Sequence, residues 1–417
     1  MRILFITQWF DPEPTFKGLA FARELASRGH EVEVVTGFPN YPGGKLYPGY
    51  RMRLRQIELV EGVRVVRVPL YPSHDGSSVR RAVNYLSFGL SAAVLGLPVV
   101  RQPDVAYVYH PPATTAFPAI VARALRRLPF VYDVQDLWPD SIRATGMLRR
   151  GFGLRLVERW CEITYRLADR LVVLSPGFRN ALVERGVPPE KISVIYNWCD
   201  EGEIHPRPPD QELARALGLA GRVNVIFAGN MGLAQALESV LECALLCRET
   251  MPEVQFVFVG SGLDRGRLEE RARSMGLPNV LFLPARPVEE IGPVLALADA
   301  LLVHLKDDPL FRITVPSKTQ AYLAAGRAII MAVQGDAAEL VTQAGAGICC
   351  RSEDPEALAA AIQQLVQLGR QARQRMGTAG RRYYEENLSF SAGVTKFERV
   401  FEAAATRRPL TTKSQWS

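Results

Sequence analysis

The sequence predicts an α/β protein with two domains, each a doubly wound parallel sheet covered by helices, and three observations support this prediction. Short apolar runs alternate with segments of helical spacing along almost the whole chain. The 417 residues exceed the size of one ordinary core. A charged segment with three prolines, Asp200 to Gln211, separates two similar series of strands and helices.

The first series runs to about residue 200 and begins with an apolar strand almost at the N-terminus. We expect its strands at 2–7, 31–36, 63–69, 104–110, 130–134, 170–175 and 192–196. We expect its helices from 19 to 28 and at 113–127, 152–168 and 178–185. No signal peptide precedes the first strand, and six cysteines without a CxxC pair favour a reducing, cytoplasmic compartment.

The uncharged segment Ala82–Val100 approaches the length of a membrane span. Asn84, Ser87 and Ser91 lie on one helical face, and glycines and a proline interrupt the segment, so we reject a spanning helix. The opposite face carries Val83, Leu86, Leu90, Val94 and Leu97. We expect a helix packed on the sheet, and an interfacial helix lying on a bilayer is the second interpretation.

The positive charge is concentrated in the first half. Residues 1–200 hold 26 Lys and Arg against 18 Asp and Glu, or +8, whereas the whole chain carries +7. This excess predicts an anionic partner, or reflects ordinary solvated surface. Nucleic acid is disfavoured because aromatic side chains do not interleave with the arginines; an anionic membrane surface or a phosphorylated substrate is favoured.

The second series repeats the pattern of the first. We expect its strands at 223–230, 254–262, 280–286, 300–305 and 327–333. We expect its helices at 234–248, 267–275, 290–297, 358–368 and 372–386, and a last amphipathic helix at 390–405. A polar, disordered tail is expected after it.

Two helix starts lie close together between residues 306 and 341. Ser317 with Gln320 three residues later predicts a capping box, and Asp336 with Glu339 repeats this pattern. Helix N-termini at the carboxyl edge of a parallel sheet favour a bound phosphate, to which Lys318 would add a full positive charge. We therefore predict a diphosphate site here.

Polar residues also follow three strands of the first series. His110 is either a packed, hydrogen-bonded histidine or a site residue, and we favour the site slightly. Asp136 either lines the same site or caps the next segment, and the two interpretations are about equally supported. Asn197 follows the last of these strands.

Several short motifs resemble a known family in their order and spacing. They are Arg28-Gly29-His30-Glu31-Val32, Asn230-Met231-Gly232, Gly260-Ser261-Gly262 and Ala324-Ala325-Gly326. Together they resemble the retaining glycosyltransferases of family four, which have the GT-B fold. The loops FPNYPGG, QDLWPDS, VIYNWCD and GNMGLAQ are more specifically similar to the bacterial L-fucosamine and colanic acid glycosyltransferases of surface-polysaccharide synthesis.

The resemblance implies four regions: an acceptor-binding domain at 1–200, a donor-binding domain at 201–388, a crossover helix at 389–406 and a tail at 407–417. It implies a nucleotide diphosphate sugar as donor and a cleft between the two domains. The donor-binding residues that it implies, with those of the predicted diphosphate site, are Gly18, Asn230, Gly232, Pro284, Arg286, Ser317, Thr319 and Glu339. His110 and Lys318 would be catalytic, and Asp136 and Asn197 would line the acceptor side.

The sequence departs from the family pattern at four positions. Ile313 and Ala321 stand where two glutamates are usual, and Asn230 and Gln235 stand where an arginine and a lysine are usual. Glu339, or Asp307 and Asp308, are candidates to replace a missing sugar or ribose contact. These departures leave Lys318 and the helix N-termini to offset the diphosphate charge.

The function expected is retaining transfer of a sugar, from a UDP-linked N-acetylamino or deoxy sugar, to a lipid-linked saccharide at the inner face of the plasma membrane. No metal and no cofactor are expected, because no convincing DxD-like motif follows a strand. A nucleotide-sugar 2-epimerase of the same fold and a non-catalytic partner subunit are the alternatives. The lost glutamates argue mildly against the epimerase, which needs acid–base carboxylates.

Overall fold

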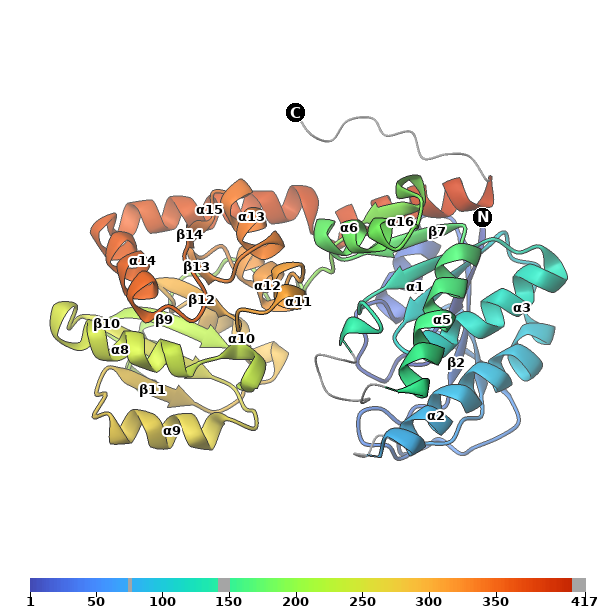
Figure 1. The fold of residues 1–417 in the computed structure, drawn as a ribbon, viewed down its shortest axis with the longest axis horizontal. Coiled ribbons are helices and arrows are strands. Elements are labelled where there is room, and N and C mark those ends of the chain that lie inside the picture. Colours follow the sequence, from blue (N-terminus) through green and yellow to red (C-terminus); the bar gives the residue numbers. More distant parts are fainter. Residues whose placement is uncertain (74–76, 142–150, 407–417) are drawn as a thin grey trace. The chain divides into compact units, whose positions relative to one another are not determined.

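The computed structural model describes residues 1–73, 77–141 and 151–406 (Figure 1). The chain forms two compact units. Unit 1 comprises Met1–Ile195 and the segment that begins at Val394, and unit 2 comprises Tyr196–Gly393. The predicted tail at 407–417 lies outside the described residues.

Unit 1 is built on an eight-stranded sheet with the order β3-β4-β2-β1-β5-β6-β7-β8. Its strands are β1 (Arg2–Ile6), β2 (Glu31–Gly37), β3 (Gln56–Val60), β4 (Val63–Val68), β5 (Val105–His110), β6 (Phe130–Val134), β7 (Arg170–Val173) and β8 (Ile192–Val194). All neighbours are parallel except β3, which pairs antiparallel with β4 at the edge. The strand order reverses between β1 and β5.

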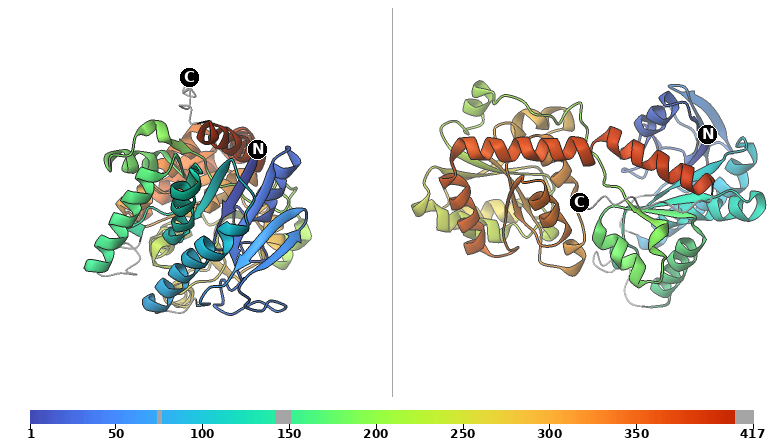
Figure 2. Two further views of the ribbon diagram at one scale, coloured as in Figure 1. Left: turned by 90° about the vertical axis from the view of Figure 1, so that its right-hand side faces the viewer. Right: turned by 90° about the horizontal axis from the view of Figure 1, so that it is seen from above.

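Helices cover both faces of this sheet. They are α1 (Leu19–Ser27), α2 (Ser78–Ser91), α3 (Ala116–Arg126), α5 (Phe152–Leu167), α6 (Pro176–Glu184) and α16 (Phe390–Ala405), with short turns η1 (Ala92–Gly96), η2 (Leu97–Val99), η3 (Ala113–Thr115) and η4 (Pro189–Lys191). The last helix packs on α1 and β5, because the ring centroid of Phe397 lies 5.1 Å from that of Phe21 and 5.7 Å from that of Tyr107. Figure 2 shows this helix in red.

Helix α2 packs on unit 1 through its polar face. Asn84 is buried, accepts a hydrogen bond from Gln8 and donates one to the Tyr71 carbonyl oxygen, while Ser87 Oγ accepts from the Tyr71 nitrogen. Of the apolar residues on the opposite face, Val83, Leu86, Leu90 and Val94 are exposed, whereas Leu97 is buried. Ser78–Val99 is, among the described residues, the one helix long and apolar enough to cross a membrane. The segment packs on unit 1, with η1 against β4 and β2, but most of its apolar stripe faces outward.

Unit 2 is built on a six-stranded parallel sheet with the order β11-β10-β9-β12-β13-β14. Its strands are β9 (Val223–Ala228), β10 (Val254–Val259), β11 (Val280–Leu283), β12 (Ala300–His304), β13 (Ile329–Ala332) and β14 (Gly347–Cys349). Its helices are α7 (Gln211–Ala216), α8 (Glu238–Thr250), α9 (Arg265–Ser274), α10 (Val288–Leu295), α11 (Pro309–Arg312), α12 (Ser317–Ala324), α13 (Asp336–Gln343), α14 (Pro355–Gln367) and α15 (Gly369–Asn387), with η5 (Leu233–Gln235) before α8.

Alternate residues of these strands enter two separate cores. One core joins the sheet to α7, α10, α12, α13 and α15, and the other joins it to α8, α9 and α14. For example, Ile226 belongs to the first core and Phe227 to the second. Both faces are therefore covered, as a doubly wound sheet requires. The strand order reverses between β9 and β12.

The predicted α/β class and strand–helix alternation are confirmed. The sequence prediction missed β3, β14 and α7, which are short. It placed a helix from 234, whereas η5 holds residues 233–235 and α8 starts at Glu238.

Candidate functional site

The carboxyl ends of β9 and β12 meet where the strand order of unit 2 reverses, which is the usual ligand position in an open α/β sheet. The loop that follows β9 begins at Gly229, whose φ of 136° suits glycine. A Cβ atom added to Gly229 would lie 3.5 Å from Lys318 Nζ. The structure thus brings the β9 loop and the start of α12 together.

Lys318 lies in the first turn of α12 and points into unit 2. Its Nζ atom is buried, has no hydrogen-bond partner among the described residues, and lies 3.6 Å from the centroid of the Phe227 ring. Burial lowers the pKa of Lys318 to about 7. An unpaired buried ammonium group is costly, and an anion at this position would satisfy it.

The start of α12 differs from the predicted capping box. Pro316 occupies the N-cap position, Ser317 is the first helical residue, and no side chain caps the helix. The capping role assigned to Ser317 is therefore wrong, since proline offers no side-chain oxygen. The Thr319 N–H donates to the Pro316 carbonyl oxygen at 2.8 Å, so the N–H groups of Ser317 and Lys318 are the ones left for another acceptor. Thr319 lies one residue further and is fully buried, with Oγ1 unpartnered among the described residues.

The second predicted helix start also differs. Gly335, with φ 79°, is the N-cap of α13, and Asp336 is the first helical residue without a side-chain cap. The capping role of Asp336 is wrong as well. Glu339 lies exposed in the first turn of α13, where a carboxylate is favoured by the helix dipole.

The β9 loop is compact because glycines allow close backbone approach. A Cβ atom on Gly260 would lie 2.0 Å from the Gly229 carbonyl oxygen, and one on Gly262 would lie 2.1 Å from that of Met231. Asn230 is exposed in this loop, and the Gly232 N–H donates to Gln235 Oε1 at 3.0 Å. Gly232 therefore shapes the loop, and the Asn230 side chain is the more available donor for a ligand.

Pro284 and Arg286 follow β11 at the same edge of the sheet. Pro284 is exposed, and Arg286 donates to Glu290 at 3.0 Å. Arg265 donates to the carbonyl oxygens of Gly260 and Leu283 and so fastens the ends of β10 and β11 together. This segment can offer backbone groups to a nucleotide base.

In unit 1, His110 ends β5 at that unit's own point of strand reversal. Its side chain is 1% exposed, and its ring centroid lies 5.1 Å from that of Trp138 in an edge-on contact. Nδ1 has no partner among the described residues. Burial lowers the pKa of His110 to about 3, so the ring is neutral at physiological pH.

Gly18 is the N-cap of α1, but an acidic side chain occupies the space beside it. Asp11 Oδ2 accepts a hydrogen bond from the Leu19 N–H at 2.7 Å, and a Cβ atom on Gly18 would lie 2.2 Å from the same oxygen. In this structure Gly18 therefore faces the carboxylate of Asp11, which already offsets the positive end of the helix dipole.

Asp136 and Asn197, both predicted on the acceptor side, belong to different units. Asp136 follows β6 in unit 1; its side chain is exposed, but surrounding protein raises the pKa of its carboxyl group. Asn197 is buried and belongs to unit 2.

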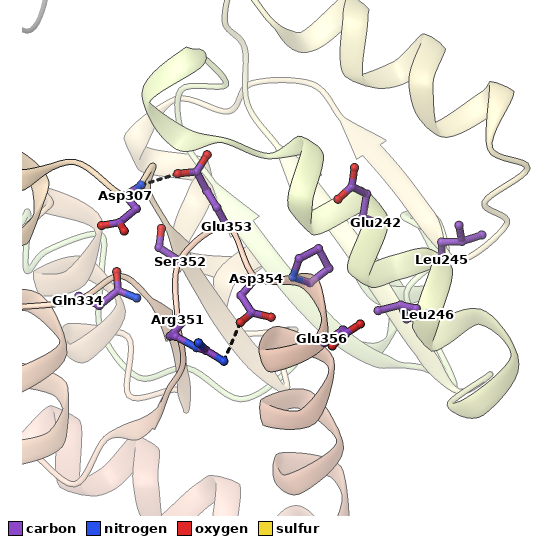
Figure 3. Close-up of a pocket in the computed structure, with 11 residues that line it drawn as sticks. Glu242, Leu245, Leu246, Asp307, Gln334, Arg351, Ser352, Glu353, Asp354 and Glu356 are labelled. Atoms are coloured by element: carbon purple, nitrogen blue, oxygen red, sulfur yellow. Dashed lines mark hydrogen bonds and ion pairs between the residues drawn. The ribbon is translucent and has the colours of Figure 1, made fainter.

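The loop after β14 lines an acidic hollow of about 590 Å³ (Figure 3). Its lining residues are Glu242, Leu245, Leu246, Asp307, Gln334, Arg351, Ser352, Glu353, Asp354, Pro355 and Glu356. Asp307 also pairs with Arg312, and Asp308 caps α11 through the Leu310 N–H. Because five acidic groups face one arginine in the lining, the hollow is unsuited to a diphosphate, and the Lys318 side of the sheet edge is preferred.

Sequence reasoning missed two residues of the unit 2 site. Phe227 lies beneath the Lys318 ammonium group, and His304 ends β12 beside the β9 loop. A single phenylalanine or histidine in an apolar strand is most often core, and their positions become informative only once the sheet order is known.

Two sequence family models match the chain. Residues 19–198 match the model described as glycosyl transferase 4-like domain, and residues 222–368 match the model described as glycosyl transferases group 1. The two matches fall in succession along the chain.

Two curated bacterial proteins are similar in sequence. The putative colanic acid biosynthesis glycosyl transferase WcaI of Escherichia coli K12 is 29% identical over 413 residues, 93% of this chain and 96% of its own. The probable glycosyltransferase WbjE of Pseudomonas aeruginosa is 27% identical over 319 residues, 76% and 77% of the two chains.

Solved structures share the fold. The sucrose-phosphate synthase of Thermosynechococcus elongatus has a TM-score of 0.70 at 16% identity, covering 97% of this chain and 99% of its own. Anabaena Alr3699/HepE, in complex with UDP and glucose, has a TM-score of 0.69 at 17% identity, covering 96% and 99%. These likenesses confirm the predicted GT-B fold.

Proposed function

Because the chain belongs to the glycosyltransferases whose two domains it carries in succession, we propose that it transfers a sugar, with retention, from a nucleotide diphosphate sugar to a lipid-linked saccharide of a surface polysaccharide. The observation that carries the donor half of this proposal is the buried, unpartnered ammonium group of Lys318 at the carboxyl edge of the unit 2 sheet. It is supported by the uncapped start of α12.

The leaving group of such a reaction is a nucleoside diphosphate, which gains negative charge as the glycosidic bond breaks. Lys318 and the first N–H groups of α12 would stabilise that charge, and they are fixed in position before the donor binds. Asn230 would add a neutral hydrogen bond to the same phosphates. No step in this account needs a metal ion, so we propose metal-independent transfer.

The donor is proposed to be UDP-linked, with an N-acetylamino or deoxy sugar. The similarity to WcaI and WbjE and the UDP bound by Alr3699/HepE support this choice. The base would meet the backbone around Pro284 and Arg286. Glu339 is proposed as a sugar contact, since its carboxylate is exposed in the first turn of α13.

On the acceptor side, we assign His110 an orienting role. A neutral ring whose Nδ1 has no partner within residues 1–73, 77–141 and 151–406 can exchange one hydrogen bond with a sugar hydroxyl, but its lowered pKa makes it a poor proton acceptor. Asp136, exposed after the end of β6, would meet polar groups of the acceptor.

The test is donor binding and turnover by the wild type and by Lys318→Ala, with Lys306→Ala as the matched control. Lys306 is exposed in the same unit, and its contact with the β9 loop is made by its main-chain N–H, which the substitution retains. We expect Lys318→Ala to lose about 100-fold or more in turnover with an unchanged fold, and Lys306→Ala to be close to wild type. Near-normal transfer by Lys318→Ala would overturn the site assignment.

Product analysis separates the alternative classes. Transfer requires that the sugar leave the donor only when an acceptor is present. Free nucleotide with an altered sugar, formed from donor alone, would identify a 2-epimerase instead. Binding without turnover, whatever acceptor is offered, would identify a non-catalytic subunit.

The acceptor is proposed to reach unit 1 from the inner face of the plasma membrane, and helix α2 is the proposed contact. Its outward stripe is apolar: Val79 is 73% exposed, Leu86 62% and Leu90 60%. A large exposed apolar stripe marks an interaction surface. The outward position of this apolar stripe is explained if the bilayer covers it.

The edge strand β3 extends this surface. Arg55 donates to the Leu95 carbonyl oxygen at 3.3 Å, which places the start of β3 beside η1. Leu54 and Leu59 are 78% and 73% exposed. Arg53 and Arg55 flank Leu54 in the sequence, and the +8 charge of the first 200 residues complements an anionic lipid surface.

Vesicle sedimentation tests this contact. We expect the protein to bind phosphatidylglycerol vesicles more than phosphatidylcholine vesicles, and the triple variant Leu86→Ser, Leu90→Ser, Val94→Ser to lose about tenfold or more in partitioning. Leu125→Ser, an 80% exposed leucine on α3, is the control. Equal binding by the triple variant and wild type would overturn the α2 contact.

A further inference from the structure

His304 is the last residue of β12, and its imidazole contacts two different loops. Nδ1 lies 2.7 Å from the main-chain carbonyl oxygen of Gln235. Nε2 lies 3.4 Å from the main-chain nitrogen of Glu353 and 3.1 Å from Ser239 Oγ. The side chain is 1% exposed, so water cannot replace these contacts.

These partners determine which nitrogen carries the proton. A carbonyl oxygen only accepts, so Nδ1 must donate to Gln235. Nε2 lies between the Glu353 N–H, which only donates, and Ser239 Oγ, which itself donates to the Ala236 carbonyl oxygen at 2.8 Å. The proton on Nδ1 is therefore the one that the geometry assigns, and it is the proton that holds Gln235. Burial lowers the pKa of His304.

Gln235 connects His304 to the β9 loop. Its Oε1 atom accepts from the Gly232 N–H at 3.0 Å, and its own N–H donates to the Gly232 carbonyl oxygen at 3.0 Å. The turn Gly232–Gln235 thus closes on itself and is attached to β12 through His304. A second attachment runs from the Lys306 N–H to the Ala234 carbonyl oxygen at 2.9 Å.

The opposite side of the ring is held by the loop that lines the acidic hollow. The Glu353 carboxylate accepts from the Asp307 N–H at 2.6 Å, which Figure 3 shows as a dashed line. Ser352 Oγ donates to the Leu305 carbonyl oxygen. The loop after β14 therefore holds the His304 ring through the Glu353 N–H. The ring in turn holds the β9 loop through the Gln235 carbonyl oxygen.

We propose that His304 is a positioning residue: through Nδ1–H it holds the turn Gly232–Gln235, and so keeps Asn230 beside Lys318 for the diphosphate of the donor. This inference rests on the proposed function, because it assigns the turn to the donor site. It adds a residue that would not touch the substrate and acts through the backbone of Gln235.

The test compares two amide replacements that separate the two nitrogens. His304→Asn places an N–H donor near the position of Nδ1, whereas His304→Gln places its amide near Nε2. We expect His304→Gln to raise the KM for the donor about fivefold to tenfold, the equivalent of one neutral hydrogen bond, with less change in kcat. His304→Asn should stay within about twofold of wild type.

Hydrogen exchange of residues 229–236 without donor gives a second readout. We expect faster exchange there in His304→Gln than in His304→Asn, and no change in His205→Asn, the control in the same unit. Equal donor KM and equal exchange in the two His304 variants would overturn the inference. A wild type that binds no nucleotide sugar, with the exchange difference intact, would overturn the proposed function and leave the positioning contact standing.

Discussion

Lys318 Nζ lies 3.6 Å from the centroid of the Phe227 ring and has no hydrogen-bond acceptor among the residues that the structure describes. The ring face attracts the ammonium group but replaces only part of its lost hydration. Burial consequently lowers the pKa of Lys318 from 10.5 to about 7. A bound anion would therefore supply the partner that the ammonium group lacks. This affects both donor affinity and protein stability.

Donor affinity should depend on pH. In the free protein Lys318 is half protonated near pH 7, and a bound diphosphate favours the protonated form. Binding above pH 7 therefore takes up a proton. We expect the apparent affinity for UDP to fall by about tenfold per pH unit above 7, until the pKa of the complex is reached. Titration calorimetry in buffers of different ionisation enthalpy would measure this proton uptake.

Lys318→Met is the control for this pH dependence, because it keeps the apolar stem and removes the titrating group. Its weaker affinity should be nearly flat between pH 6.5 and 8.5. A wild-type affinity that is equally flat would mean that Lys318 does not titrate in this range and does not hold the diphosphate.

The same substitution should stabilise the protein without donor. The pKa of Lys318 is lower in the folded state, so the unfolded chain binds more protons between about pH 7 and 10.5, and wild-type stability rises over this window. Below pH 7 the folded protein bears the full free-energy cost of burying the charged ammonium group of Lys318. We expect Lys318→Met to raise the free energy of unfolding by about 1–3 kcal/mol at pH 6.5, and by less at pH 9.5.

Thermal unfolding of both proteins at the two pH values would measure this difference. A wild type that is more stable than Lys318→Met at pH 6.5 would show that the ammonium group has a compensating partner. The interpretation that Lys318 lacks a partner until an anion binds would then be wrong.

The fold could be predicted from the sequence because strand-sized apolar runs and helical spacing are local properties. The strand predicted at 130–134 is β6 to the residue, and the position of Lys318 followed from a recognisable helix start. The role of His304 could not be predicted, because its partners lie 69 and 49 residues away in the sequence. Only the assembled sheet brings them together.

The sequence also could not predict which face of α2 is buried. Helical spacing identifies a polar and an apolar face, but it does not say which faces the protein. The polar face turns inward because the Tyr71 backbone and Gln8 need hydrogen-bond partners there, and Asn84 and Ser87 supply them. The capping errors have a similar cause, since the neighbouring Pro316 and Gly335 took the positions assigned to Ser317 and Asp336.

A buried ion pair in unit 1 should be sensitive to the loss of one partner. Lys17 Nζ lies 2.7 Å from Asp133 Oδ2, both side chains have 0% exposure, and Tyr107 donates to the same oxygen. Burial lowers the pKa of Lys17, while the attraction of Asp133 opposes this shift. We expect Lys17→Met to destabilise unit 1 by about 3–5 kcal/mol, because the carboxylate loses its cation.

The double variant Lys17→Met, Asp133→Asn separates the pair from its surroundings. The double variant should recover part of the free energy of unfolding lost in Lys17→Met, because no unpaired charge remains. Calorimetric thermal unfolding would measure the difference. A double variant as unstable as the sum of both single variants would show that the two groups contribute independently.

The contact between α16 and the end of α1 should weaken at low pH. Glu398 accepts from Arg28 at 2.7 Å and is 3.0 Å from His30 Nε2. Burial opposes ionisation of Glu398, but the hydrogen bonds from His30 and Arg28 outweigh this effect and lower the pKa of Glu398 below its ordinary value of 4.5. The contribution of this carboxylate is therefore complete above about pH 4.5 and is lost as pH falls through the folded-state pKa.

We expect Glu398→Gln to destabilise unit 1 by about 1 kcal/mol at pH 7, a modest value because the pair is partly exposed. The difference from wild type should shrink below about pH 4.5. Hydrogen exchange along α16 at pH 7 would locate the loss, which should be greatest near Thr395, the second acceptor of Arg28. Unchanged exchange in α16 would mean that the aromatic contacts of Phe397 and Phe401 hold the helix without help from these charges.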